Sequence, residues 1–468
     1  MTIDGQQSES LQYCEVINPA IGEAFAQCQQ GNVEELNKAV AAAKTAFNSW
    51  SQTSSAERKD IMLALAGVLE ANMPELMALI TQETGKPMGG LNNVGSGMEV
   101  GGSIAWTQMT AELELAVDVV QDNDSARIEV HRKPLGVIGS ITPWNWPLMI
   151  AIWHIIPALR TGNTVVIKPS EQTPVSTLRF VELANEVLPA GVLNIVTGEG
   201  DVGHALTTHK DVSKIIFTGS TETGKRIMSS SSCNLKRLTL ELGGNDAGIV
   251  LPDVDVKSTA NQLFGACFHN NGQTCAALKR LYVHESIYDA VCDEMAELAK
   301  QVKVGNGLEE GVELGPIQNA KQLQIVIDLA EDAKANGGRF LSGGNKIAGE
   351  GYFFEPTIVA DLTDGSRLVD EEPFGPIVPI IKYSDVDAVI AKANENDAGL
   401  GGSIWSKDIA KATELAKRME CGSVWINTHG AIQPNAPFGG IKQSGFGVEF
   451  GLYGLEECTS IQTLSIPK

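Results

Sequence analysis

Residues 137–167 have the sequence VIGSITPWNWPLMIAIWHIIPALRTGNTVVI. Two short apolar runs, at 137–141 and 164–167, flank a longer apolar segment at 148–159. Short apolar runs are typical of fully buried strands, whereas the longer segment has the length of a helix. The order strand, helix, strand predicts a βαβ unit with parallel strands.

The same alternation continues along most of the chain. We expect further strands at 193–196, 214–217, 247–250 and 280–284, and helices at 33–50, 175–187, 202–207, 258–268 and 287–301. The stretch 55–80 is expected to contain at least one more helix, with a break at the polar residues from Glu70 to Pro74. The pattern restarts after the glycine pair at 243–244 and runs to about 425. Strands that alternate with helices predict an α/β protein with a Rossmann-like parallel-sheet lobe and a second α/β lobe.

Residues 126–132, ARIEVHR, alternate apolar and polar side chains, which is typical of a strand with one covered face. A second strand of this kind is expected at 459–464. We expect the two to pair outside the parallel sheets as a small antiparallel extension that contributes to a subunit contact.

The formal net charge is −22, and no run of Lys or Arg exceeds a pair. A nucleic-acid binder, or a protein held on anionic lipid, needs a basic face, so both classes are disfavoured. No uncharged apolar run reaches the roughly 18 residues of a membrane span. The 8 cysteines are scattered without a CxxC pair, which is typical of reduced thiols, and the N-terminus is polar; both favour the cytoplasm.

Two glycine turns follow predicted strands. The turn 219–225, GSTETGK, resembles a phosphate-binding loop, but Arg226 stands where such a loop needs a hydroxyl for Mg²⁺. ATP chemistry is therefore disfavoured, although the amides at a helix start still make a good anion site. Gly198-x-Gly200-x-x-Gly203 is a weaker signal, and a plain tight turn explains it equally well.

Polar residues also follow the strand at 164–167. Lys168, Ser170 and Glu171 lie where open α/β sheets bind ligands, at the carboxyl end of a parallel strand. A lysine there can hold hydroxyl or phosphate oxygens. A carboxylate can accept from the two hydroxyls of a ribose and repels a 2′-phosphate. The alternative is an exposed polar loop.

Three residues have side chains that could take part in catalysis. Cys275 follows a turn of small and polar residues, Glu241 ends an apolar strand, and Asn145 lies in the rigid loop that begins at Pro143. Burial between leucines raises a carboxyl pKa and makes a general base, and a fixed amide is a good oxyanion donor. Taken singly, they could equally be a buried thiol, a charged strand end and a structural corner. A metal site with Cys267 and His269 is disfavoured because no second ligand cluster accompanies them.

Taken together, seven segments resemble the aldehyde dehydrogenase superfamily in its own order over nearly the whole chain. They are PWNWP (143–147), GNTVVIKPSE (162–171), FTGSTETGK (217–225), LELGG (240–244), NNGQTCAA (270–277), EEPFGP (371–376) and PFGGIKQSG (437–445). The resemblance implies oxidation of an aldehyde to the acid with NAD, through a thiohemiacetal and a thioester on a cysteine. It also implies a homodimer or a homotetramer.

The resemblance implies a role for each matching residue. Cys275 is the nucleophile, Glu241 the general base and Asn145 an oxyanion donor. The cofactor-binding residues are Lys168, Ser170, Glu171, Gly219, Ser220 and Gly224, with Glu372 and Phe374 at the nicotinamide end. Because Glu171 would repel a 2′-phosphate, NAD is favoured over NADP. Residues 1–121 and 140–245 are expected to bind NAD, 246–426 to form the catalytic domain, and 122–139 with 427–468 to bridge and oligomerise.

Two positions depart from the family pattern. Asn245-Asp246 stands where a lysine and a small residue usually follow the glycine pair, and Pro373 stands where an aliphatic residue is usual. Neither removes a catalytic group. A CoA-acylating relative and a non-enzymatic relative are the alternatives, and the presence of Glu241 and Cys275 argues against each.

The substrate is left open by the sequence. The expected wall of its pocket comprises Trp146, Ile150, Trp153 and residues 429–436, HGAIQPNA, which include no Lys or Arg. Apolar and aromatic walls favour a medium aliphatic or an aromatic aldehyde.

Overall fold

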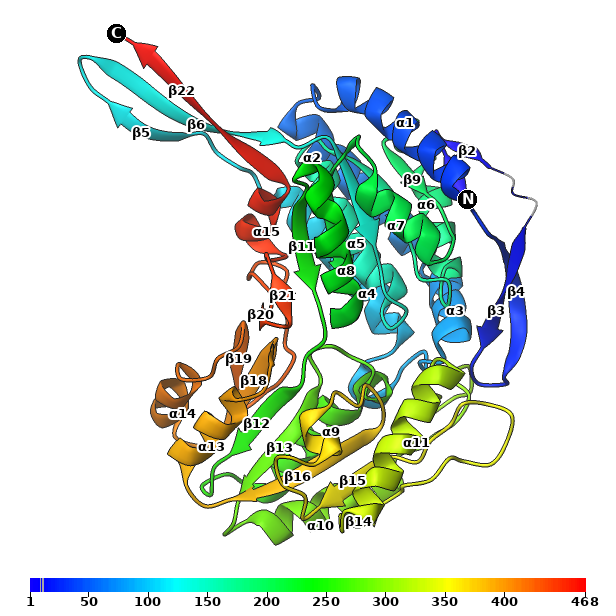
Figure 1. The fold of residues 1–468 in the computed structure, drawn as a ribbon, viewed down its shortest axis with the longest axis vertical. Helices are drawn as coiled ribbons and strands as arrows, with labels where there is room; N and C mark the ends of the chain where they lie inside the picture. The colour runs from blue at the N-terminus through cyan, green and yellow to red at the C-terminus, as the bar shows by residue number, and fades with distance from the viewer. Residues whose placement is uncertain (9, 11) are drawn as a thin grey trace.

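The computed structural model describes residues 1–8, 10 and 12–468, which form two α/β lobes and a projecting arm (Figure 1). The first lobe is built on a sheet of order β2-β1-β9-β8-β7-β10-β11-β21. Its strands are β1 (Thr2–Ile3), β2 (Gln6–Gln7), β7 (Val137–Ile141), β8 (Thr164–Lys168), β9 (Leu193–Ile195), β10 (Val212–Thr218), β11 (Arg237–Glu241) and β21 (Gly445–Phe446). The strands from β7 to β11 are parallel, and antiparallel strands lie at both edges.

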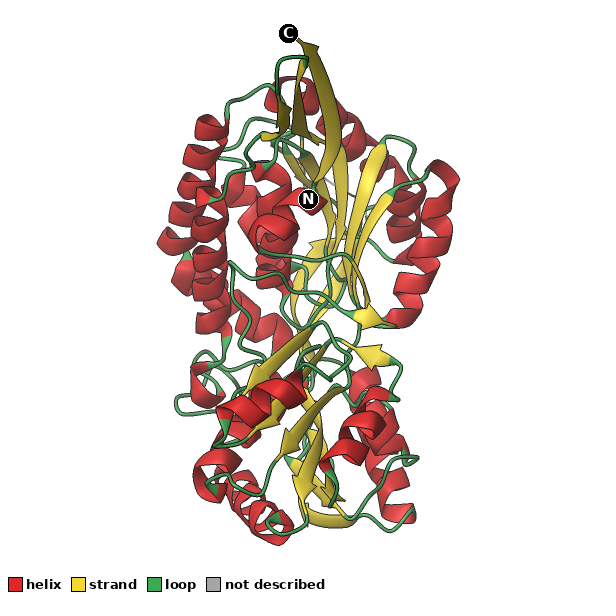
Figure 2. Cartoon of the chain, turned by 90° about the vertical axis from the view of Figure 1, so that its left-hand side faces the viewer, coloured by secondary structure: helices red, strands yellow, loops and turns green. Residues whose placement is uncertain are grey.

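Helices cover both faces of this sheet, so its central strands are buried throughout, as Figure 2 shows. They are α1 (Val33–Trp50), α2 (Ser55–Ala71), α3 (Met73–Thr84), α4 (Ser96–Glu112), α5 (Pro147–Arg160), α6 (Val175–Ala184), α7 (Gly200–Thr208), α8 (Thr221–Ser231) and α15 (Gly451–Glu457), with short 3-10 helices η1 (Leu91–Asn93) and η2 (Ser232–Asn234). A separate hairpin, β3 (Tyr13–Asn18) and β4 (Glu23–Gln29), precedes α1. The predicted unit at 137–167 is confirmed as β7-α5-β8, with β7 and β8 parallel neighbours.

The second lobe repeats the plan with a sheet of order β14-β15-β16-β13-β12-β18-β19. Its strands are β12 (Asp246–Val250), β13 (Leu278–His284), β14 (Arg339–Ser342), β15 (Thr357–Ala360), β16 (Ile377–Tyr383), β18 (Gly401–Trp405) and β19 (Ser423–Ile426), and β17 (Ala398–Gly399) pairs separately with β20 (Ile441–Lys442). Its helices are α9 (Val256–Phe268), η3 (His269–Gly272), α10 (Tyr288–Gln301), α11 (Ala320–Ala335), α12 (Arg367–Asp370), α13 (Val386–Asn394) and α14 (Ile409–Ala416). The mixed α/β class with two parallel-sheet lobes is therefore confirmed.

The arm is the expected antiparallel extension. Strand β6 (Ala126–Pro134) pairs along its length with β22 (Thr459–Pro467), and β5 (Asp118–Asp122) adds the third strand. Figure 1 shows this sheet projecting from the first lobe. The arm begins at Asp118, a few residues before the boundary of 122 expected from the sequence, because the alternation in ARIEVHR shows only the central strand.

The break expected from Glu70 to Pro74 in the helical stretch 55–80 is confirmed, and the stretch forms two helices. Asn72 ends α2 and Pro74 lies in the first turn of α3, where a proline is tolerated because that N–H has no helical partner. Over the described residues, no single helix has the length and apolarity of a membrane span, and the bent pair α2–α3 passes that test only when both helices are taken together. The pair buries Leu65, Leu69, Leu76 and Ile80 in the core of the first lobe.

Candidate functional site

A cavity of about 230 Å³ lies between the lobes, at the carboxyl ends of β7, β10 and β11. The second lobe contributes residues from the loop before β13, the loop before β16 and helix α11. The lining residues are Pro143, Trp144, Asn145, Thr218, Gly219, Ser220, Leu242, Gly243, Cys275, Gln322, Ile325, Glu372 and Phe374. Four predicted groups that belong to distant segments, the Cys275 thiol, the Asn145 amide, the Glu372 carboxylate and the Phe374 ring, thus meet at one opening.

The loop that presents Cys275 is held by left-handed backbone and buried amides. Asn270 and Asn271 have φ of 49° and 59°, a region that asparagine tolerates better than most residues. The Gln273 side chain donates to the Asn270 carbonyl (3.2 Å) and accepts from the Gln318 amide (2.9 Å). The turn that follows α9 is therefore rigid, which fixes the start of the Cys275 segment.

Burial raises the pKa of the Cys275 thiol to about 12. The Lys279 ammonium opposes this shift, whereas the carboxylates of Glu372, Glu241 and Asp246 add to it. The thiol is thus protonated near neutral pH in this structure, so its attack on a carbonyl requires a proton acceptor.

Asn145 is buried, and two partners fix its loop. Its side-chain amide donates to the Gln273 carbonyl (2.9 Å), which leaves a second N–H available toward the cavity. Its own carbonyl accepts from Lys86 Nζ (2.7 Å), and Lys86 forms a fully buried ion pair with Glu99 (2.5 Å). Glu99 also accepts from the Leu148 amide at the start of α5 (3.0 Å). Neither Lys86 nor Glu99 belongs to a local motif, so nothing in the sequence pointed to them.

Glu241 ends β11 with a side chain that is 3% exposed, and its carbonyl accepts from the Gly219 amide (3.0 Å). Within the described part of the chain, neither carboxyl oxygen has a hydrogen-bond partner. Burial, together with the nearby carboxylate of Glu449, raises the pKa of Glu241 well above its usual range. Its neighbour Leu242 lines the cavity and Glu241 itself does not, so the side chain lies behind the wall in this structure.

Glu372 and Phe374 border the cavity from the loop before β16. The Glu372 carboxylate accepts from Lys279 Nζ (2.7 Å) and from the Gly244 amide (3.2 Å). Phe374 is left-handed (φ 46°), and its ring meets Trp144 edge to face at 5.3 Å. Lys279 could not be identified from the sequence, because it approaches Glu372 only in the folded chain.

The two departures from the family pattern are accommodated. The Pro373 carbonyl accepts from the Gln322 side chain (2.9 Å), which ties this loop to α11. The Asn245 side chain donates to the carbonyls of Val369 and Asp370 (2.9 and 3.2 Å), and Asp246 Oδ2 lies 3.3 Å from His429 Nε2. Both polar residues are buried and in contact with polar partners.

The predicted cofactor residues lie at the carboxyl ends of the central strands of the first sheet. Lys168 is in register with Ile141, and Ile141 with Phe217, so Lys168, the Asn145 loop and Gly219 follow neighbouring strands. Burial lowers the pKa of Lys168, whose Nζ approaches the Pro169 carbonyl (3.1 Å) and Glu171 (3.4 Å).

The turn between β10 and α8 forms the expected helix start. Ser220 caps α8 by accepting from the Thr223 amide (3.3 Å), which leaves other amides of the first turn free for an anion. Gly224 packs within α8, where an added Cβ would lie 2.6 Å from the Leu242 side chain. Lys168, Ser170, Glu171 and Gly224 are not among the residues that line the cavity itself.

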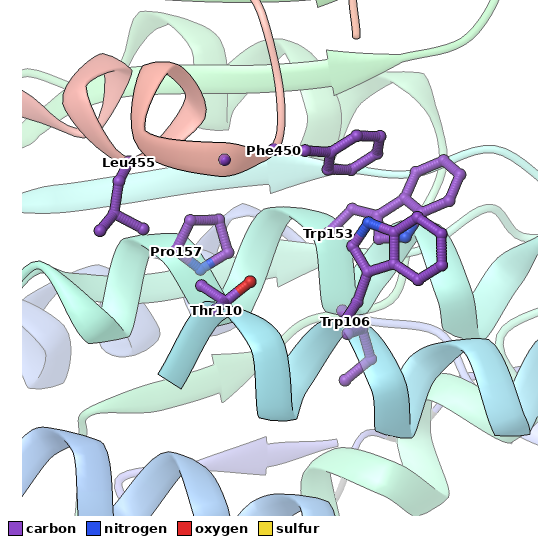
Figure 3. Close-up of a pocket in the computed structure, with 8 residues that line it drawn as sticks. Trp106, Thr110, Trp153, Pro157, Phe450 and Leu455 are labelled. Carbon is purple, nitrogen blue, oxygen red and sulfur yellow. The ribbon is translucent and has the colours of Figure 1, made fainter. Parts of the chain in front are cut away.

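On its other side, Cys275 borders a cluster of apolar side chains. The buried members are Trp146, Met149, Ile150, Trp153, Ala276, Leu400, Phe438 and Phe450, and Ile432 from the predicted loop 429–436 packs against them. Figure 3 shows Trp106, Trp153 and Phe450 close together beside a small cavity, with ring centroids 4.8 to 5.7 Å apart. Over the described residues, no group of His, Cys, Asp and Glu side chains is arranged to hold a metal ion.

Comparisons with known proteins agree with this geometry. The model of the aldehyde dehydrogenase family matches residues 6–464. A phenylacetaldehyde dehydrogenase of Pseudomonas fluorescens is 41% identical, covering 100% of this chain and 95% of its own, and a betaine aldehyde dehydrogenase of Bacillus subtilis is 38% identical over 98% and 96%. The NAD⁺ complex of an aldehyde dehydrogenase from Bacillus cereus has a TM-score of 0.97 at 35% identity, covering 100% of this chain and 96% of that one.

Proposed function

The chain belongs to the aldehyde dehydrogenase family and oxidises an aldehyde with NAD, and from this premise we propose that Cys275 is the nucleophile, Glu241 the general base and Asn145 an oxyanion donor. The observation that carries the proposal is the shared lining of one cavity by Cys275, Asn145, Glu372 and Phe374. A thiol, a fixed amide donor and the expected nicotinamide-end residues at one opening are what oxidation through a thioester requires.

The residues at the carboxyl ends of the central strands are suited to bind the cofactor. Free amides at the start of α8, beside Ser220, suit a pyrophosphate. Lys168, Ser170 and Glu171 suit the adenosine ribose, and Glu372 with Phe374 the nicotinamide end. Gly224 serves by letting Leu242 pack closely behind the cavity. When bound, NAD supplies the acceptor for the hydride of the aldehyde.

The steps of the reaction follow from the side chains. The Cys275 thiol loses its proton to solvent, and its sulfur bonds to the carbonyl carbon to give a thiohemiacetal, whose oxyanion accepts from Asn145. Collapse of this intermediate with loss of hydride leaves a thioester on Cys275. Glu241 then takes a proton from water, the resulting hydroxide adds to the thioester, and the acid departs as the expelled thiolate takes that proton from Glu241.

Replacing Asn145 by alanine should lower kcat by about 10²–10³, since a preorganised oxyanion donor is worth that much. The fold should survive, because the Asn145 carbonyl that Lys86 holds is part of the backbone. Steady-state NADH formation and circular dichroism of the variant test this. An Asn145→Ala enzyme with parental kcat would remove the residue from the mechanism.

Glu171 should govern the choice between NAD and NADP. Its side chain is half exposed, beside Lys168. Removing its charge in Glu171→Gln takes away the repulsion of a 2′-phosphate, so kcat/KM for NADP relative to NAD should rise by about tenfold. Glu186→Gln, an exposed carboxylate beyond the end of α6, is the matched control. If kcat/KM for NADP relative to NAD were the same in Glu171→Gln and Glu186→Gln, Glu171 would not set the cofactor preference.

We propose an apolar substrate, of the medium aliphatic or the aromatic class. The support is the cluster of tryptophan, phenylalanine and aliphatic side chains beside Cys275, together with a loop at 429–436 that includes no Lys or Arg. A panel of phenylacetaldehyde, hexanal, betaine aldehyde and a carboxylate-bearing semialdehyde, assayed with NAD, tests the class. Higher kcat/KM for either charged aldehyde than for both apolar ones would contradict it.

We propose that the parts of the chain divide the work as the sequence predicts: residues 1–121 and 140–245 bind NAD, residues 246–426 carry out catalysis, and residues 122–139 with 427–468 bridge or oligomerise. The arm exposes Val119, Val120, Ile461 and Leu464, which supports a homodimer or a homotetramer held partly by that sheet. We also infer a cytoplasmic location, since the cysteines are free thiols.

A further inference from the structure

Lys279 is a buried lysine that joins three parts of the site. It is the second residue of β13, and its side chain is 3% exposed. Its ammonium group donates to the Gly244 carbonyl (2.7 Å), the Cys275 carbonyl (2.5 Å) and Glu372 Oε1 (2.7 Å). An ammonium has three hydrogens, so these acceptors use all of them.

These three acceptors lie in three separate loops, outside the helices and strands. Gly244 lies in the crossing from the first lobe to the second, Cys275 in the loop before β13, and Glu372 in the loop before β16. Gly243 is also close, because an added Cβ there would collide with the Glu372 carboxylate. One charged group thus fixes the relative positions of the thiol-bearing peptide and the carboxylate at the nicotinamide end.

Stability alone is a weak reason to bury such a pair. Removing an ammonium from water costs several kcal/mol, and a buried ion pair is often no more stabilising than apolar packing in its place. Lys279 is also the cation that acts on the thiol. The charged groups that face Cys275 are Lys279, Glu372, Glu241 and Asp246, of which only the lysine favours the thiolate.

We propose that Lys279 is a positioning residue of the reaction, whose ammonium group holds the Cys275 peptide and the Glu372 carboxylate in place and sets a positive charge beside the residue that bears the thiol. This inference rests on the proposed roles of Cys275 and Glu372. It goes beyond them because it assigns the orientation of both groups to one residue that does not itself line the cavity.

The test is Lys279→Met, which keeps most of the length of the unbranched side chain and removes its charge and donors. Two measurements report on the two functions. Alkylation of Cys275 by iodoacetamide, followed as a function of pH by mass spectrometry of its peptide, should slow about tenfold at each pH below the thiol pKa. KM for NAD should rise by about tenfold, because Glu372 loses a charged partner. Lys300→Met, which removes an exposed lysine on α10, should change neither.

Lys279→Arg separates position from charge. The guanidinium keeps the positive charge, so the alkylation profile should remain near that of the parent. Its planar donors cannot converge on three acceptors as an ammonium does, so KM for NAD should stay raised. A purely structural role would lower the melting temperature and leave the alkylation profile of the folded protein unchanged.

A folded Lys279→Met enzyme with parental alkylation and parental KM for NAD would overturn the inference. If that variant does not fold, Lys279→Met/Glu372→Gln removes the charge left unpaired and is compared with Glu372→Gln alone; slower alkylation in the double variant supports the inference, and equal rates overturn it. Cys275→Ser tests the proposed function separately. Full activity of Cys275→Ser would contradict the assignment of Cys275 as the nucleophile. If Cys275→Ser is inactive and Lys279→Met behaves as the parent, only the role of Lys279 is contradicted.

Discussion

Cys275→Ala should lose on the order of 10⁴–10⁶ in kcat, the loss seen when the nucleophile of a covalent mechanism is removed. The thioester cannot form without the sulfur, and among the residues that the structure describes no other cysteine lines the cavity. The variant should still bind NAD, because Lys168 at the end of β8 and the start of α8 do not depend on the thiol. Stopped-flow measurement of NADH formation should therefore show neither a burst nor a steady state above background.

Cys292→Ala is the matched control for this experiment. Cys292 is buried on α10, in the core of the second lobe and away from the cavity. Replacing it removes a small apolar group, so stability should fall modestly while kcat stays within a few-fold of the parent. Aldehyde oxidation by Cys275→Ala at the parental rate would refute covalent catalysis by this thiol.

Features that depend on neighbouring residues, such as strands and turns, could be predicted from local patterns in the sequence. The apolar runs at 137–141 and 164–167 became parallel neighbours, because strands that are buried on both faces are continuous apolar segments. The alternation in 126–132 predicted β6 and its pairing with the segment near 459. The left-handed turn before Cys275 uses asparagine and glycine, residues that visit this conformation readily.

Contacts between distant segments could not be predicted in this way. Lys279 stands in the strand LKRLYVH, where a charged residue indicates only a strand end, and its three acceptors come from other loops. The Lys86–Glu99 pair beneath Asn145 likewise joins the loop after α3 to α4. Glu241 was expected to be desolvated, but its neighbour Glu449 lies over 200 positions away and became visible only in the folded chain.

Glu241→Gln should lower steady-state kcat by about 10²–10⁴, since a positioned general base contributes that much to a proton transfer. The amide keeps the size of the side chain and cannot take a proton from water, so the thioester on Cys275 should accumulate. Hydroxylamine attacks a thioester without such a base. Its addition should therefore restore turnover of the variant and yield the hydroxamate of the substrate acid, whereas Cys275→Ala should show no such rescue.

The pH dependence of the parent enzyme gives a second measure of the same residue. Burial and the carboxylate of Glu449 raise the pKa of Glu241 well above its usual range, and a base acts only when ionised. Activity should therefore rise with pH through that elevated pKa and fall on acidification, and Glu449→Gln should move the rise to lower pH because it removes a neighbouring negative charge. In Glu241→Gln the rise should disappear. If Glu241→Gln kept the parental pH profile and kcat, water would have to be activated by another group.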